Sequence, residues 1–420
     1  MQIDVLLEHI GTLYTLEGEK RPRSKEALKA KGVQDGVVAV FDGQIIYGGA
    51  YPLPEEIQAS ENTQRVDCTD KVVTPGLIDA HTHLVHGGSR EKELAMKIAG
   101  ADYLEIYNAG LGIYSTQKAT READFQSLYD KARKSLDVML AHGTTTVEAK
   151  SGYGIWDFQT EIKQMQVAHQ LNANHPVDVV STFMGAHAMP AKYKENPDEF
   201  IRILTEEMMP FVKEERLAEF VDVFCEEGVF DIEQSRRILT AAKELGFGLK
   251  IHADEIVSLG GAQLAAKLPT LSAEHLIAAS DKGIQDMAQA GVIACLLPGT
   301  SFNLGKGKYA KARQMVEQGV SIALCTDYNP GSCPTENLQL IMTLAALYYR
   351  LLPEEILTAV TYNAACAIGR QEKIGSLEKG KEADLILWDA PNLDYIPYHF
   401  GVNHVERVWK KGKEVWRKAE

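Results

Sequence analysis

The sequence lacks the features that would place it in several broad classes of protein. None of its apolar stretches approaches the ~20 consecutive residues that a membrane-spanning helix needs. Its N-terminal segment contains no basic run followed by an apolar one, as a secretory signal would. The six cysteines include no CxxC pair, which argues against a structural zinc knot and against a disulfide framework. We therefore expect a soluble, cytoplasmic protein with reduced thiols.

Positive charge is scarce as well. The formal net charge of -14 argues against a nucleic-acid-binding protein, because phosphate contacts need a basic face. The composition, 45% hydrophobic and 24% charged, is typical of a globular protein with a sizeable core. A chain of 420 residues can hold one large barrel-type domain together with a small one. The expected partner is a small-molecule substrate, and neither nucleic acid nor a membrane.

Both ends of the chain carry short, apolar, strand-like segments. The predicted strands there are Ile3–Leu7, Gly36–Phe41, Gln44–Tyr47, Ala383–Trp388, Val405–Trp409 and Glu414–Trp416. Asp42-Gly43, between the second and third of these strands, is a typical hairpin turn, and Gly412 marks another turn before the last strand. We predict that residues 1–71 and 372–420 together form one small composite β-sandwich domain.

The middle of the chain alternates strand-like and helical segments. The predicted strands are Val72–His83, Thr144–Lys150, Val177–Met184, Phe220–Cys225, Gly248–His252, Thr270–His275, Val292–Leu297 and Ser321–Thr326, and helical stretches between them include Phe158–Leu171, Asp198–Val212, Ile232–Leu245 and Lys308–Gln318. Eight such units match a (β/α)₈ barrel in number and in its typical length of ~250 residues. A doubly wound open sheet is the alternative, but it predicts a Gly-rich phosphate turn after the first strand, which is absent. We predict an α/β fold with a (β/α)₈ barrel over residues 72–371.

Residues suited to metal or proton chemistry stand at the ends of four of these strands. The first strand ends in His81 and His83, and residues two apart face the same side of a strand, so both imidazoles can share one ion. The fifth, sixth and eighth strands end in His252, His275 and Asp327. Each residue alone has an ordinary structural explanation, but barrel enzymes build their sites from the C-terminal ends of several strands. The joint pattern therefore predicts a metal site at the mouth of the barrel.

The predicted metal ligands are His81, His83, His252 and Asp327. Three nitrogens and one oxygen suit zinc or iron(II) better than magnesium or calcium, and such an ion lowers the pKa of a bound water. The fourth strand has no lysine that could bridge two ions after carboxylation, and Glu226 is a possible bridge but a less favourable one. One ion per subunit is therefore expected. His275 is not needed as a ligand, and we assign it to polarising a carbonyl or stabilising an oxyanion.

Several longer segments resemble a known family. Residues Val73–His83 are very similar to the opening motif of the amidohydrolase superfamily, and Gly375–Leu385 to its return into the small β domain. Along nearly its whole length the chain resembles, within that superfamily, the imidazolonepropionase family of histidine degradation. The segments that carry this resemblance are HGGSREKE (86–93), GTTTVEAKSGYG (143–154), STFMGAHAMP (181–190), LKIHADE (249–255), LLPGTSFNLG (296–305) and TDYNPGSCPTEN (326–337).

The resemblance implies a hydrolase that acts on a carbon–nitrogen bond of a cyclic amide and opens 4-imidazolone-5-propanoate to N-formimidoyl-L-glutamate. The family's metal residues correspond to the four predicted ligands. Its substrate contacts correspond to Arg90, Tyr153, His187, Asn329, Gly331 and Ser332. Its water-activating carboxylate corresponds to Glu255, and Asp327 or His275 are the other groups able to take part in proton transfer. Barrel hydrolases of this type are often homodimers, so a homodimer with one zinc or iron ion per subunit is expected.

Other interpretations remain open from the residues alone. Arg90, Tyr153 and Glu255 would each be unremarkable on a solvated surface, and His187 would be unremarkable in a packed core. A deaminase or another cyclic-amide hydrolase could use the same fold and the same metal ligands. A non-catalytic scaffold protein would be expected to lack those ligands, and all four are present.

Overall fold

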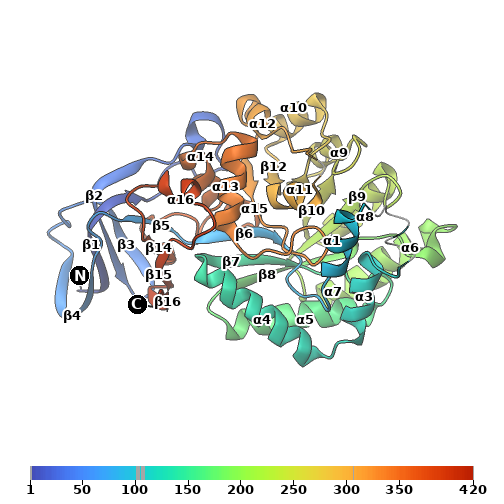
Figure 1. Cartoon of the computed structure of the whole chain (residues 1–420), viewed down its shortest axis with the longest axis horizontal. Coiled ribbons are helices and arrows are strands. Elements are labelled where there is room, and N and C mark those ends of the chain that lie inside the picture. The colour runs from blue at the N-terminus through green and yellow to red at the C-terminus, as the bar shows by residue number, and fades with distance from the viewer. Residues whose placement is uncertain (1, 101–104, 106–108, 306, 420) are drawn as a thin grey trace.

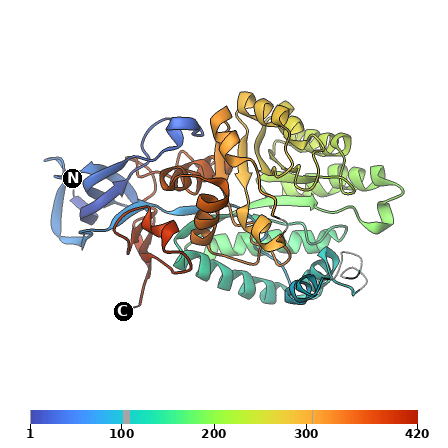
Figure 2. The same ribbon diagram turned by 45° about the horizontal axis from the view of Figure 1, so that its top comes forward.

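The computed structural model describes residues 2–100, 105, 109–305 and 307–419. Its two β-sheets lie side by side along the long axis, and both chain termini lie at the sheet drawn on the left of Figure 1. The other sheet is parallel and carries helices on its outside (Figures 1 and 2). The predicted (β/α)₈ barrel with a small β-sandwich domain made from both ends of the chain is confirmed.

The barrel is built from eight parallel strands in sequence order. They are β6 (Leu77–Thr82), β7 (Thr144–Lys150), β8 (Asp178–Ala186), β9 (Phe220–Cys225), β10 (Gly248–Ala253), β11 (Thr270–His275), β12 (Ile293–Leu296) and β13 (Ile322–Leu324). The last strand returns to the first: the His83 backbone N–H donates to the Tyr328 carbonyl at 2.8 Å, and that of Asp327 donates to the His81 carbonyl at 3.0 Å. This closure excludes an open doubly wound sheet, and it brings the ends of β6 and β13 together.

Helices and turns link the strands around the outside of the barrel. The helical elements are α1 (Glu91–Ile98), α3 (Ile113–Glu122), α4 (Phe125–Ala141), α5 (Phe158–Asn174), η2 (Ala191–Tyr193), α6 (Pro197–Arg202), η3 (Ile203–Met208), α7 (Met209–Glu214), α8 (Ile232–Glu244), α9 (Gly261–Lys267), α10 (Asp281–Ala290), α11 (Pro298–Leu304), α12 (Ala312–Gln318), α13 (Leu338–Tyr349), α14 (Pro353–Ala359), α15 (Tyr362–Ala367) and α16 (Tyr395–Tyr398). The single helix predicted over Asp198–Val212 is divided by the wider π turn η3, just before Pro210, which has no N–H to donate back along the helix. Among the described residues, no helix is long and apolar enough to cross a membrane.

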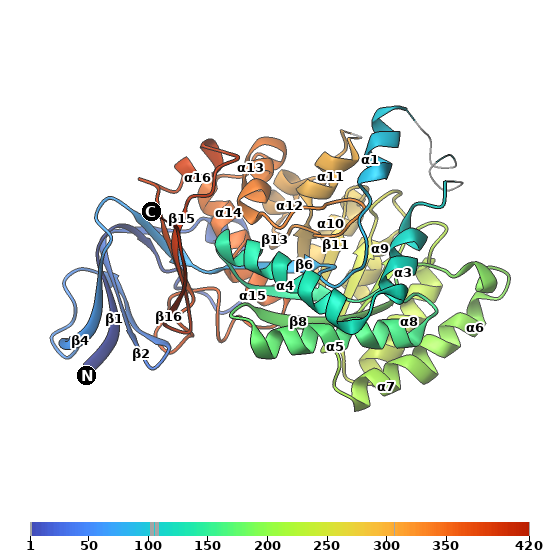
Figure 3. The ribbon, with the colours of Figure 1, turned by 60° about the horizontal axis from the view of Figure 1, so that its bottom comes forward.

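The second sheet, sheet A, joins the two ends of the chain. Its elements are β1 (Gln2–Tyr14), β2 (Gly32–Phe41), β3 (Gln44–Ala50), β4 (Gln58–Asp67), β5 (Val72–Pro75), β14 (Leu385–Trp388), β15 (Val405–Lys410) and β16 (Lys413–Arg417), with the short helix η1 (Lys25–Leu28) after β1. Strand β5 lies between β1 and β14 and so connects the N-terminal and C-terminal parts. Leu13 of β1 and Trp409 of β15 belong to one buried cluster, so the sheet folds over a shared core. Figure 3 shows the two parts facing each other.

The single strand predicted over Val72–His83 is wrong, because the chain changes sheets at Gly76. The Gly76 N–H donates to the Asp384 carbonyl in the sandwich at 2.9 Å, whereas the next N–H, of Leu77, donates to the Gly143 carbonyl in the barrel at 3.0 Å. A Cβ on Gly76 would lie 2.3 Å from the Thr145 hydroxyl oxygen, so only glycine fits this crossing. The predicted division between residues 71 and 72 puts β5 with the barrel, whereas its pairing partners lie in sheet A.

Candidate metal centre and substrate pocket

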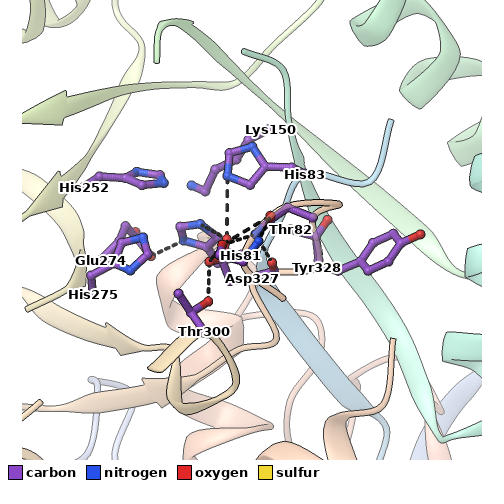
Figure 4. Close-up of polar contacts among 12 residues, drawn as sticks. His81, Thr82, His83, Lys150, His252, Glu274, His275, Thr300, Asp327 and Tyr328 are labelled. Carbon is purple, nitrogen blue, oxygen red and sulfur yellow. Dashed lines mark hydrogen bonds and ion pairs between the residues drawn. The ribbon is translucent and has the colours of Figure 1, made fainter. Parts of the chain in front are cut away.

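The four predicted metal ligands converge at the C-terminal ends of the barrel strands (Figure 4). Asp327 Oδ1 lies 3.3 Å from His81 Nε2 and 3.7 Å from His83 Nε2. One ring nitrogen from each of His81, His83 and His252 lies within 4.8 Å of the others. Ligands bound at ~2.0–2.1 Å around a tetrahedral ion lie roughly 3.3–3.4 Å apart, so the two distances from Asp327 are close to those around a shared metal ion.

The hydrogen bonding of two histidines leaves metal-facing nitrogens available. His81 Nδ1 lies 2.8 Å from Glu274 Oε2, and His252 Nδ1 lies 3.0 Å from Asp222 Oδ1. The opposite nitrogens, Nε2 of both rings, are buried and have no hydrogen-bond partner among the described residues. A carboxylate behind a histidine is the usual support of a metal ligand, and buried polar atoms rarely remain unpaired. The residues therefore fit a bound metal ion.

A buried ionic network that was not predicted from the sequence lies beneath these histidines. Lys150 Nζ is 2.7 Å from Asp222 Oδ2 and 3.0 Å from Glu148, and Lys250 Nζ is 3.2 Å from Glu148 Oε2 and 4.0 Å from Glu274 Oε1. All five side chains are completely buried. The two lysines thus hold the carboxylates that orient His81 and His252. Charged residues inside otherwise apolar strands were the available signal, because burying such charges without partners is costly.

Changing a predicted ligand, or the carboxylate that orients it, should weaken metal binding. We expect His252→Ala to lose most of its metal during dialysis, because three ligands rarely hold what four hold. Asp222→Asn should lower metal affinity by roughly 10- to 100-fold, the usual effect of removing such a support. Elemental analysis and competition with a chelator measure both, with His9→Ala, an exposed histidine on sheet A, as the control. Full metal retention in both active-site variants would refute the assignment.

Asp327 has an unusual backbone and well-defined partners. Its φ is 58°, in the left-handed region that non-glycine residues rarely adopt, and such strain is common at functional sites. Thr300 Oγ1 donates to its Oδ2 at 2.5 Å, so Oδ1 is the oxygen that faces the histidines. Asp79 also helps to place this segment: it accepts hydrogen bonds from the Thr326 N–H at 3.0 Å and from the Thr326 hydroxyl at 2.5 Å.

A cavity of about 550 Å³ opens above the histidine cluster. All six predicted substrate contacts line it: Arg90, Tyr153, His187, Asn329, Gly331 and Ser332. Glu255, His275 and three of the predicted ligands also line it, while His81 is fully buried. The structure thus brings together residues from distant parts of the sequence. Glu93, Lys97 and Phe224 also line the cavity and were not predicted.

Glu255 and His275 face each other at the edge of the cluster. Glu255 Oε2 lies 3.6 Å from His275 Nε2, and only 16% of the Glu255 side chain is exposed. Burial lowers the pKa of His275 to about 3, so its imidazole is neutral. A neutral imidazole can donate a hydrogen bond to an oxygen that gains negative charge.

The segment that carries Glu255 is held on both sides. Before it, the Asp254 carboxylate accepts hydrogen bonds from the N–H groups of residues 260, 261 and 262 at 2.9–3.0 Å. After it, the Glu226 carboxylate accepts from the N–H of Ile256 at 2.8 Å and from that of Val257 at 3.3 Å. Glu226, the possible metal bridge, therefore supports the Glu255 segment, and it does not line the cavity.

His187 and Tyr153 form the wall beside His83. The His187 ring stacks on that of His83, with centroids 4.8 Å apart and planes inclined by 8°. Its Nδ1 lies 3.1 Å from the Gly152 carbonyl oxygen. Gly152 has a φ of 114°, and a Cβ there would lie 2.7 Å from this Nδ1, so glycine is required. The buried Tyr153 ring lies 5.5 Å from the His187 ring, and together they offer two flat surfaces to a planar ligand.

The loop after β13 is organised by Asn329. Its Oδ1 accepts hydrogen bonds from the N–H groups of Gly331 and Ser332, both at 2.8 Å. Its Nδ2 donates to the Asp327 carbonyl at 2.7 Å and to the Ser332 hydroxyl at 2.8 Å. The side chain of Asn329 therefore maintains the shape of the loop that lines the pocket.

Comparison with known proteins decides the family. The profile of the Amidohydrolase family matches residues 72–415. An imidazolonepropionase of Alkaliphilus oremlandii is 56% identical over 420 residues, covering 100% of this chain and 99% of its own. One from Treponema denticola is 55% identical and covers 91% of this chain and 92% of its own. The chain belongs to the imidazolonepropionase family of amidohydrolases.

Solved structures of other proteins have the same fold as this chain. A zinc-bound adenosine deaminase of Xanthomonas campestris superposes with a TM-score of 0.69 at 20% identity, covering 98% of this chain and 93% of that chain. The guanine deaminase of E. coli superposes with a TM-score of 0.70 at 14% identity, over 99% of both chains. At these identities the likeness concerns the fold alone.

Proposed function

We propose that this chain is an imidazolonepropionase, which hydrolyses a ring C–N bond of 4-imidazolone-5-propanoate and gives N-formimidoyl-L-glutamate in histidine degradation. The observation that carries the proposal is that Arg90 lines the same cavity as His83, His252 and Asp327, with His81 buried next to them. Arg90, a cation at one side of the cavity, suits binding of the propionate carboxylate. A metal ion held by the cluster would favour attack of water on the ring carbonyl. The name of the relatives at 54–56% identity supports the same activity.

For the cofactor, we propose one zinc or iron(II) ion per subunit, held by His81, His83, His252 and Asp327. When bound, such an ion lowers the pKa of a coordinated water and polarises a carbonyl. The preference for these metals follows from the three nitrogen donors.

The chain's own residues move the protons. Glu255 accepts a proton as the water oxygen bonds to the ring carbonyl carbon, and His275 donates a hydrogen bond to the carbonyl oxygen as negative charge develops there. Glu255 then delivers its proton to the ring nitrogen as the C–N bond breaks, with the bonding electrons going to that nitrogen. The water oxygen remains in the new carboxylate. His187 and Tyr153 orient the planar ring, and Arg90 orients the tail.

An assay of ring opening tests the proposal directly. Purified protein of known metal content should convert imidazolone propionate to one equivalent of N-formimidoyl-glutamate. The loss of ring absorbance and NMR of the product measure this conversion. Adenosine and guanine should release no ammonia, which separates this activity from the deaminase alternative on the same fold. Ammonia release from a heterocycle, without opening of imidazolone propionate, would refute the proposal.

We also propose that the protein is a homodimer. Tyr398, Phe400 and Val402, at and just after α16, are 78%, 66% and 44% exposed. Exposed large apolar side chains that are close in sequence are typical of a contact surface. Light scattering should give twice the mass of one chain, and a monomer at micromolar concentration would contradict the proposal.

A further inference from the structure

Arg90 lies in a wall between two cavities. The substrate pocket and a neighbouring cavity of about 250 Å³ are both lined by Arg90, Lys97 and Gly331. The smaller cavity is also lined by Glu91 and Glu336, whose carboxylates would attract a guanidinium that left its place. The orientation of Arg90 therefore decides which cavity receives its charge.

Glu93 holds one edge of the Arg90 guanidinium. Arg90 Nε donates to Glu93 Oε1 and Nη2 donates to Oε2, both at 2.7 Å, in a two-point ion pair. The Gly112 N–H also donates to Oε1 at 2.6 Å, which ties the pair to the segment before α3. Burial favours protonation of Glu93, but the hydrogen bonds from Arg90 and Gly112 lower its pKa below the usual value, so it stays ionised. Within the part of the chain that the structure describes, Glu93 thus holds the Nε and Nη2 edge, and Nη1 lies on the opposite side of the guanidinium.

Gly331 closes the guanidinium in from the other side. A Cβ at this position would lie 2.1 Å from Arg90 Nη1 and 2.5 Å from its Cζ. The guanidinium thus lies directly against the backbone, in space that any side chain at 331 would take. The backbone is in turn fixed, because Asn329 Oδ1 accepts the Gly331 N–H at 2.8 Å. Three segments of the barrel mouth, after β6, before α3 and after β13, therefore meet at the Arg90–Glu93 ion pair.

We infer that Glu93 and Gly331 are positioning residues for carboxylate recognition, which direct the free edge of Arg90 into the substrate pocket. This inference rests on the proposed function, since it names the means by which the propionate tail is selected. A fixed guanidinium fork loses less entropy on binding a carboxylate than a mobile one. Lys97 lines the same pocket.

Glu93 has two effects of opposite sign on an anionic ligand. Its own negative charge repels a carboxylate, so removing it would strengthen carboxylate binding. It also holds Arg90, so removing it would weaken carboxylate binding. We expect the second effect to dominate in Glu93→Gln, because glutamine offers one acceptor oxygen in place of two and the released guanidinium has Glu336 as another partner.

Binding selectivity tests this inference. The probes are 3-(imidazol-4-yl)propanoate, which has the tail but no ring carbonyl, and its neutral amide, titrated calorimetrically into the metal-loaded protein. The wild-type chain should prefer the carboxylate, and Glu93→Gln should lower the ratio of the two affinities about 10-fold. Glu93→Asp keeps the charge but shortens the reach, and it should also lower the ratio. In an Arg90→Ala background, Glu93→Gln should change the ratio no further.

Two further variants complete the design. Gly331→Ala changes no charge and should lower the ratio as well, because the new methyl group displaces Arg90. Glu91→Gln is the matched control, because this exposed carboxylate on α1 is bonded to Ser89 and not to Arg90; its ratio should equal that of the wild type. A ratio that stays constant or rises in both Glu93 variants would overturn the positioning role. If the wild type prefers the carboxylate but does not open imidazolone propionate, the proposed function fails and the positioning role stands.

Discussion

Glu255→Gln should lower kcat by roughly 10²–10⁴-fold, the usual scale of general acid–base catalysis, and keep its full metal content. The reason is geometric: Glu255 lines the pocket 3.6 Å from His275 but does not belong to the cluster of candidate ligands. Glutamine has the same shape, so the segment held by Asp254 and Glu226 should keep its position. Steady-state kinetics together with elemental analysis of the same preparation measure both quantities.

The control for this variant is Glu227→Gln, an exposed carboxylate in the loop beside Glu226, which should behave as the wild type. Near-normal turnover of a metal-replete Glu255→Gln protein would move the proton transfer to Asp327 or His275. Asp327 is the less suitable of the two, because its Oδ2 accepts the Thr300 hydroxyl hydrogen bond and its Oδ1 faces His81 and His83.

Arg90→Ala should lower kcat/KM for imidazolone propionate by roughly 30-fold to several thousand-fold. Removing one partner of a desolvated ion pair costs ~2–5 kcal/mol of binding free energy. Each factor of ten in affinity corresponds to about 1.4 kcal/mol, which gives this range. Much of the loss should appear in KM, because the carboxylate is bound alike in the ground state and the transition state. In this protein the variant also leaves Glu93 buried without its partner, so some loss of stability is expected.

An imidazolone with a neutral amide tail separates these two effects. It offers no charge to Arg90, so its turnover should fall little in the variant, whereas misfolding or metal loss would lower the turnover of both substrates alike. Equal losses on the two substrates would mean that Arg90 is structural. The carboxylate partner would then have to be sought among Lys97, Tyr153 and the loop of residues 329–332.

Arg90 was predicted from the sequence, whereas its partner Glu93 was not. Arg90 was predicted from its resemblance to a family motif and from the chemistry of a carboxylate. Glu93, three residues later in the same charged run, looked like a solvated side chain, yet it is only 2% exposed. It accepts a hydrogen bond from the N–H of Gly112, which lies nineteen residues further along the chain. No local pattern could show that Gly112 contacts Glu93.

The sequence by itself was sufficient for the barrel, for its small β domain and for the convergence of His81, His83, His252 and Asp327. Alternation of apolar and helical segments specifies a (β/α)₈ barrel, and in that fold all strands end at the same rim, so strand-end residues must meet. The tertiary structure alone decided which charges support them. Whether Lys150 contacts Asp222, or Glu274 reaches His81, depends on strand neighbours and side-chain direction inside a closed barrel. The first contact joins residues that are 72 positions apart in the sequence, and the second joins residues that are 193 positions apart. Buried charges are stable only where the fold supplies such distant partners.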